Sequence, residues 1–140
     1  EIQLPSGYKA TINCRHDFRG RSQYNPAFGP AKAAWFGWRD DVLICGHLHT
    51  AGYSPLRDPK SGLTSHAIRV ASYKSHADNY AESLGLPDQN LFEACLLILD
   101  PAAADQRHRV RVYMDLEHGL EVLGWMRNKP PSLQQFGSGG

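Results

Sequence analysis

Two histidines in the segment Gly46-His47-Leu48-His49-Thr50 are the residues of this sequence best suited to metal chemistry. Neutral imidazole is the commonest metal ligand among side chains. The segment follows Val42–Cys45, a wholly apolar run typical of a strand buried in a parallel sheet, and ligands gather beyond the carboxyl ends of such strands. In an extended segment His47 and His49 would point the same way, and Gly46 would let the backbone turn sharply. The alternative is a pair of loop histidines bonded to nearby carbonyl groups.

A third histidine, His16, follows the predicted strand 8–14. If this strand and 42–45 are parallel neighbours, His16 reaches the same sheet edge as His47 and His49. Asp17 could orient one of the imidazole rings or could be a solvated turn residue. Three histidines from two strand ends therefore predict ligands for one metal ion, or for two ions that share bridging oxygens.

The motif Gly46-His47-Leu48-His49 resembles the closing G-H-x-H motif of calcineurin-like metallophosphoesterases, and His16 resembles their isolated upstream histidine. The segments 15–18, 24–26 and 68–74 are similar to the branch common in bacterial and phage genomes, and the resemblance covers most of 8–125. It implies that His16 and His47 bind one divalent ion and His49 a second, each being Mn, Fe, Zn or Ni. It also implies hydrolysis of a phosphomonoester, a phosphodiester or nucleic acid.

The carboxylate-bearing motifs of that family, D-x-H, G-D-x-x-D and G-N-H-[DE], do not occur in the sequence. We therefore expect residues 1–127 to be the C-terminal half of a catalytic domain, cut from a longer protein before Glu1. Alone the chain should be inactive, and it should associate with the missing N-terminal half, a second chain or another copy of itself. The alternative is a catalytically inactive binding or assembly module with a vestigial or single-metal site.

Candidate substrate-binding residues lie close to the histidines in the sequence. Arg15, Arg19 and Arg21 surround His16 and could bind phosphate oxygens, or could simply form a solvated basic loop. Asn25 and Tyr53 are weaker candidates. A separate set of arginines alternates along a predicted strand at 107–114, and it could be a nucleic-acid track, although a charged edge strand explains the pattern better.

The elements that must position these residues alternate between strand and helix, which predicts an α/β fold with a mixed β-sheet and flanking helices, half of an αββα sandwich. Strands are expected at 8–14, 42–45 and 65–72, with a hairpin of 91–99 and 107–114 and a loop at 52–62. Pro30 should lie in the first turn of a helix, and Asp115 should cap the last one. The predicted apolar helix faces are Ala31, Ala34, Trp35 and Trp38; Ala77, Tyr80, Ala81 and Leu84; and Leu116, Leu120 and Leu123.

The composition of the chain restricts the class of protein to which it can belong. The 140 residues carry a net charge of +1 and are 41% hydrophobic, which suits one ordinary globular domain and argues against disorder or bulk electrostatic binding of nucleic acid. No apolar run is long enough to span a membrane. Three cysteines without metal-type spacing predict buried reduced thiols in a cytoplasmic protein. The segment 128–140, rich in Pro, Gly and Ser, is expected to be a flexible tail.

Overall fold

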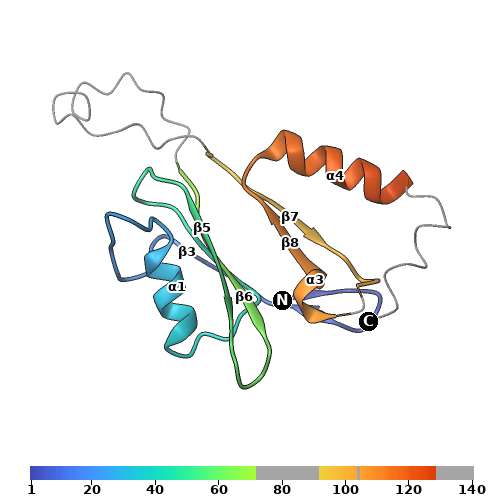
Figure 1. Ribbon diagram of the computed structural model, residues 1–140, viewed down its shortest axis with the longest axis horizontal. Coiled ribbons are helices and arrows are strands. Elements are labelled where there is room, and N and C mark those ends of the chain that lie inside the picture. The colour runs from blue at the N-terminus through green and yellow to red at the C-terminus, as the bar shows by residue number, and fades with distance from the viewer. Residues whose placement is uncertain (72–91, 104, 129–140) are drawn as a thin grey trace.

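The computed structural model describes residues 1–71, 92–103 and 105–128 (Figure 1). The predicted helix at 77–84 and the segment 129–140 lie outside these ranges. The elements are, in chain order, β1 (Ile2–Gln3), β2 (Lys9–Ala10), β3 (Ile12–Arg15), α1 (Phe28–Trp35), β4 (Val42–Cys45), β5 (Gly52–Arg57), β6 (Thr64–Arg69), β7 (Leu96–Leu99), α3 (Gln106–Arg109), β8 (Val110–Tyr113) and α4 (Leu116–Asn128).

The main sheet has four strands in the order β3-β4-β6-β5. Strand β4 is parallel to both of its neighbours, with Val42 opposite Ile12 on β3 and opposite His66 on β6. Strand β5 pairs with β6 in the antiparallel direction. The wholly apolar sequence of β4 fits its central position. The predicted α/β class, the mixed sheet and the parallel pairing of the first two strands of this sheet are confirmed.

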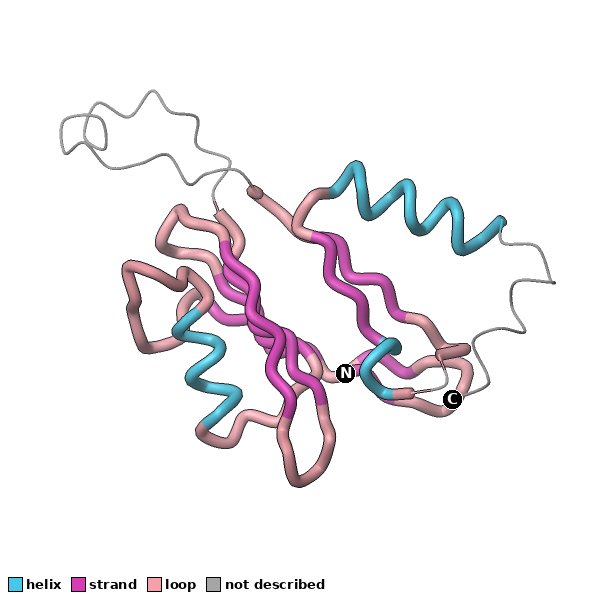
Figure 2. Tube along the Cα trace, in the orientation of Figure 1, coloured by secondary structure: helices cyan, strands magenta, loops and turns pink. Residues whose placement is uncertain are grey.

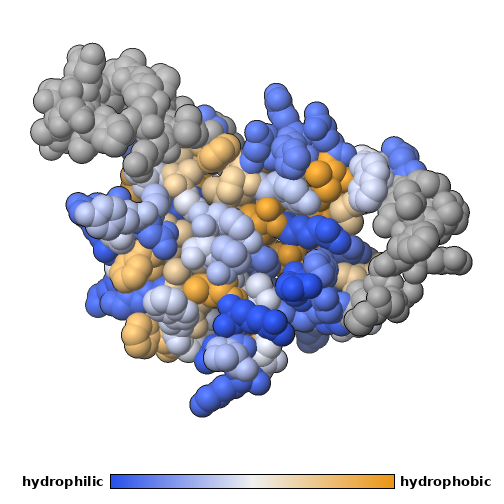
Figure 3. All heavy atoms as spheres, in the orientation of Figure 1, coloured by the Kyte–Doolittle hydropathy of each residue, from blue (hydrophilic) through white to orange (hydrophobic). Residues whose placement is uncertain are grey.

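The elements stack in four layers, with helices on the two outer sides and strands between them (Figure 2). On one face of the main sheet, Leu43 packs with Phe18 and with Ala34 of α1. On the other face, Val42 packs against Val110 of β8, so the β7–β8 hairpin forms the next layer. Helix α4 covers the outer side of that hairpin. Apolar atoms reach the surface in the middle of the face shown in Figure 3, among hydrophilic side chains.

Both outer helices pack through small residues, and the predicted apolar faces are partly wrong. Helix α1 ends at Trp35, which is 65% exposed, and Trp38 lies beyond the helix. The helix instead buries Gly29, Pro30, Ala31 and Ala34. It approaches the loop after β3 so closely that a Cβ on Gly29 would lie 2.4 Å from the backbone oxygen of Phe18. In α4 the buried residue is Gly119, while Leu116 and Leu120 are exposed. Asp115 accepts a hydrogen bond from His118 N, so the predicted cap is confirmed.

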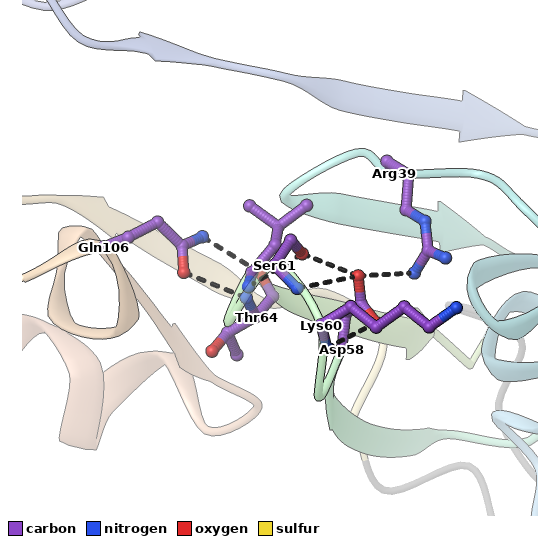
Figure 4. A network of polar contacts seen from close by, with 7 residues as sticks. Arg39, Asp58, Lys60, Ser61, Thr64 and Gln106 are labelled. Carbon is purple, nitrogen blue, oxygen red and sulfur yellow. Dashed lines mark hydrogen bonds and ion pairs between the residues drawn. The ribbon is translucent and has the colours of Figure 1, made fainter.

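The predicted loop at 52–62 is in fact strand β5 followed by a tight turn. Pro55 is tolerated there because β5 is an edge strand, where a missing N–H costs no ladder bond. The carboxylate of Asp58 organises the turn by accepting hydrogen bonds from the Ser61 hydroxyl at 2.6 Å and the Lys60 N–H at 3.3 Å. Arg39 forms an ion pair with the same carboxylate (Figure 4).

Gln106 joins the two sheets at the end of the molecule where the parallel strands begin. Its amide accepts from Thr64 N at 2.9 Å and donates to Thr64 O at 3.1 Å, as a neighbouring strand would (Figure 4). It also donates to the buried carboxylate of Asp41, which accepts from Thr11 and from the hydroxyl of Tyr8. Burial and the Asp41 contact raise the pKa of Tyr8. Hydrogen bonds of Gln106 therefore link the β7–β8 hairpin to the main sheet at this end of the molecule.

The antiparallel hairpin predicted from 91–99 and 107–114 is confirmed, but its connection includes the short helix α3. The arginines at 107, 109 and 111 therefore do not alternate along one strand face, and the nucleic-acid track is not formed. Each has a local partner: Arg107 pairs with Asp105, Arg111 pairs with Asp100, and Arg109 lies over the Tyr8 ring.

All three cysteines are free, but the prediction that all are buried is wrong, because Cys14 is exposed and Cys95 is half-buried. Cys14 lies on β3, the outer strand of the main sheet, which pairs only with β4 in the described part of the chain. Cys45 is buried in β4. In the same described part, no helix is long and apolar enough to cross a membrane.

Candidate metal centre

Two of the three predicted histidine ligands lie together at the carboxyl edge of the main sheet. His16 follows β3 directly, His47 comes two residues after β4, and the ends of these parallel strands are paired through Arg15 and Cys45. The His16 and His47 rings are 4.5 Å apart between centroids, at 64° to each other. Both side chains are exposed. The structure thus places these two imidazoles where a ligand could reach both.

The segment that carries His47 and His49 is not extended, so the strand-like backbone that the prediction assumed for the two histidines is wrong. His47 has a φ of 73° and His49 a φ of 53°, and Leu48 N donates to Gly46 O at 3.0 Å in a γ-turn. The positive φ angles belong to the histidines rather than to Gly46. The chain turns here because its next strand, β5, lies on the far side of β6. Among the described residues, no ring contact or hydrogen bond joins His49 to His16 or His47.

Arg69, the last residue of β6, holds the loops that carry the two histidines. Its side chain is fully buried, and its guanidinium donates hydrogen bonds to Gly46 O, to Pro26 O at 2.8 Å and to Asp17 Oδ1 at 2.9 Å. Gly46 directly precedes His47, and Asp17 directly follows His16. One buried cation therefore fixes both sides of the candidate site.

The Asp17 carboxylate accepts a hydrogen bond from Arg69, and among the described residues no hydrogen bond joins it to an imidazole ring. Partial burial acts to raise the pKa of this carboxyl, but the hydrogen bond and charge of Arg69 outweigh it, so the pKa is lowered. Sequence analysis missed Arg69 because nothing in a sequence distinguishes a buried arginine from an exposed one at a strand end.

The predicted substrate-binding arginines divide into two groups. Arg15 and Arg19 line a pocket of about 430 Å3 beside His16, and the guanidinium of Arg15 lies 4.0 Å from the centroid of the Trp38 ring. Arg21 lies in the same loop but does not line this pocket.

Asn25 and Tyr53 make hydrogen bonds that support the local structure. Asn25 Oδ1 accepts from Ala27 N at 3.0 Å, just before α1 begins. The Tyr53 hydroxyl forms a 2.8 Å hydrogen bond with Nδ1 of His66, which is buried in β6. Burial lowers the pKa of His66 and raises that of Tyr53. Contact of Asn25 or Tyr53 with a substrate stays a prediction.

The described residues fit part of a metal ligand set and not a whole one. His16 and His47 supply two nitrogen donors side by side, whereas protein zinc sites use three or four protein ligands. In residues 1–71, 92–103 and 105–128 no group of three or more His, Cys, Asp or Glu side chains could hold a metal ion.

No family model, curated protein or solved structure matches this chain. The functional assignment therefore depends on the G-H-x-H motif and on the geometry of the paired histidines.

Proposed function

We propose that this chain supplies the histidine half of a metal-dependent phosphoesterase. His16 and His47 would bind one of two divalent ions, and His49 the other. The observation that carries the proposal is the 4.5 Å separation of the His16 and His47 rings at the carboxyl edge of a parallel sheet, where ligands bind in open α/β folds. His47 belongs to the G-H-x-H motif that resembles the metallophosphoesterase family, and His16 resembles the isolated upstream histidine of that family.

Two divalent ions, when bound, would supply a hydroxide nucleophile and neutralise charge on the phosphoryl oxygens. The chain's own residues do the rest of the work proposed here. Arg69 hydrogen-bonds to Gly46 O and Asp17 Oδ1, so it would restrain the two loops that carry the histidines before a ligand arrives. Arg15 and Arg19, which line the pocket near His16, would contact phosphate oxygens of an ester substrate.

The carboxylate ligands and the group that protonates the leaving oxygen would come from an N-terminal half of the domain or from a second chain. In the described part of the chain no strand pairs with the outer edge of β3, so such a segment could add a strand there, next to His16. Without it, the chain should bind metal weakly and hydrolyse nothing.

A titration with Mn²⁺ followed by NMR tests the metal half of the proposal. Ring protons of His16 and His47 should broaden at the lowest Mn²⁺ concentrations, because paramagnetic broadening detects even weak binding. His118, exposed on α4, is the matched control and should broaden only at higher concentrations. Equal broadening at His16, His47 and His118 would show that the pair is no metal site.

An activity assay tests the catalytic half. The chain, combined with the sequence encoded upstream of Glu1, should hydrolyse a chromogenic phosphodiester with Mn²⁺, and His47→Ala should abolish that activity without unfolding the protein. An upstream sequence that lacks the D-x-H, G-D-x-x-D and G-N-H motifs would overturn the proposal, as would a complete protein without hydrolytic activity.

A catalytically inactive binding or assembly module is the second candidate. The observation in its favour is that the described residues contain no complete metal ligand group. In that case His16 and His47 are vestigial or hold a single ion. Unchanged association with a partner in His47→Ala, together with an upstream sequence free of the carboxylate motifs, would support this second function.

A further inference from the structure

A pocket of about 430 Å3 opens beside His16, on the side of the main sheet covered by α1. The end of β3 contributes Arg15 to its lining, and the loop after β3 contributes Asp17 and Arg19. Helix α1 and the turn after it contribute Lys32, Phe36 and Trp38. We call it the Arg15–Trp38 pocket. Because Arg15 directly precedes His16, the pocket adjoins the candidate metal centre.

The charges of the Arg15–Trp38 pocket suit an anion. Its lining includes three cationic side chains, Arg15, Arg19 and Lys32, and one carboxylate, Asp17. The Asp17 carboxylate already pairs with the buried Arg69 at 2.9 Å. Among the described residues, Arg19 and Lys32 have no acidic partner, and both are exposed. An anionic ligand would meet positive charge without displacing an existing ion pair.

The aromatic side chains of the pocket offer flat apolar surface to the same ligand. Phe36 is 79% exposed and Trp38 is 40% exposed, so neither is needed to fill the core. The Arg15 guanidinium lies over the Trp38 ring at 4.0 Å from its centroid, which extends the flat surface. Inorganic phosphate or a simple phosphomonoester would leave these rings unused, whereas a nucleobase stacks on such groups.

Cations beside exposed aromatic rings are the combination that binds single-stranded nucleic acid. We propose that the Arg15–Trp38 pocket binds a nucleotide unit, with its base against Phe36 and Trp38 and its phosphate beside Arg19 and Lys32. A single strand is the ligand favoured, because paired bases in a duplex are not free to stack on a protein ring. The inference that this nucleotide unit is the substrate rests on the proposed phosphoesterase function. The inference that the pocket binds a nucleotide does not depend on that function.

Binding is measured by fluorescence anisotropy with a short labelled oligothymidylate at low salt, in EDTA. The unmodified chain should bind the single strand more tightly than a hairpin duplex. Phe36→Ala should weaken binding about ten-fold, as expected for one lost base–aromatic contact. Trp35→Ala is the matched control: Trp35 is 65% exposed at the same helix end but does not line the pocket, so its replacement should leave binding unchanged.

A salt titration tests the cations separately. Lys32→Ala should reduce the slope of log affinity against log salt by about 0.7, the value for one phosphate contact on a single strand. Lys60→Ala, which removes an exposed lysine of the β5–β6 turn that does not line the pocket, should leave the slope unchanged. Equal effects of the Lys32 and Lys60 variants would overturn the assignment of the phosphate to this pocket.

Competition assays distinguish the source of the ligand. If a free mononucleotide competes as well as the oligothymidylate, the Arg15–Trp38 pocket is still the binding site, and its ligand is a single nucleotide. Equal affinity for duplex and single strand, equal effects of Phe36→Ala and Trp35→Ala, or binding only to anionic lipid vesicles would overturn the proposal. Because EDTA keeps divalent ions away, failure here leaves the proposed metal chemistry untouched, and failure of the Mn²⁺ titration leaves this pocket untouched.

Discussion

Replacing Arg69 with methionine should remove the support on which the candidate metal centre is built. Methionine keeps a long unbranched side chain but has no N–H group. The hydrogen bonds to Pro26 O, Gly46 O and Asp17 Oδ1 would all be lost. The loops after β3 and β4 would then no longer share a common anchor.

The expected cost follows from the burial of the two partners. Breaking a buried ion pair by removing one member costs about 3–5 kcal/mol. The Arg69 side chain is 0% exposed, but that of Asp17 is 30% exposed, so water can solvate the carboxylate left behind. We therefore expect Arg69→Met to lower the free energy of unfolding by about 3 kcal/mol, the lower end of that range.

Urea unfolding followed by tryptophan fluorescence measures this loss, with Arg57→Met on the exposed edge strand β5 as the control. The control should change stability by less than about 0.5 kcal/mol. If Arg69→Met does not fold, Arg69→Lys keeps the charge and should lose less. The ring contact between His16 and His47, read from NOEs, should weaken in both Arg69 variants. A loss below about 1 kcal/mol in Arg69→Met, with the ring contact intact, would refute the reasoning.

Three further predictions concern the scaffold. Gln106→Ala should lower the free energy of unfolding in urea by about 1–3 kcal/mol, because it leaves the buried N–H and C=O of Thr64 unpaired; an unchanged midpoint would contradict this. Burial lowers the pKa of His66, so the unfolded chain binds a proton that the folded protein excludes, and stability should fall as pH drops through about 6.5. In thermal melts, the melting temperature of His66→Gln should fall less with decreasing pH than that of the unmodified protein. Equal falls would show that His66 is not the group responsible. Gly29→Ala should cost about 1–3 kcal/mol because its Cβ would lie 2.4 Å from a backbone oxygen, whereas Gly46→Ala meets no atom within 4 Å and should cost nothing; equal melting temperatures would count against this packing.

The sequence was most informative where one physical requirement dominated. Val42–Cys45 had to be a central strand because four consecutive apolar residues need cover on both faces. The prediction that large apolar residues form the buried face of the helices was wrong for α1. This helix packs closely through Gly29 and leaves Trp35 exposed to solvent. The pairing of His16 with His47 followed from parallel strand ends, but the γ-turn at His47 did not, since it arises from where β5 must begin. Arg69 was invisible because only the folded chain shows that its charge is buried.

The outer edge of β3, which is unpaired among the described residues, would determine how a completing segment has to be built. A strand added beside β3 would lie about 4.8 Å away, so only one of its two ends could approach His16. A strand running in the same direction as β3 would bring the residues that follow it to the histidines. A strand running in the opposite direction would bring the residues that precede it. Strand direction would therefore fix whether the acidic groups of that segment have to be encoded just after the added strand or just before it.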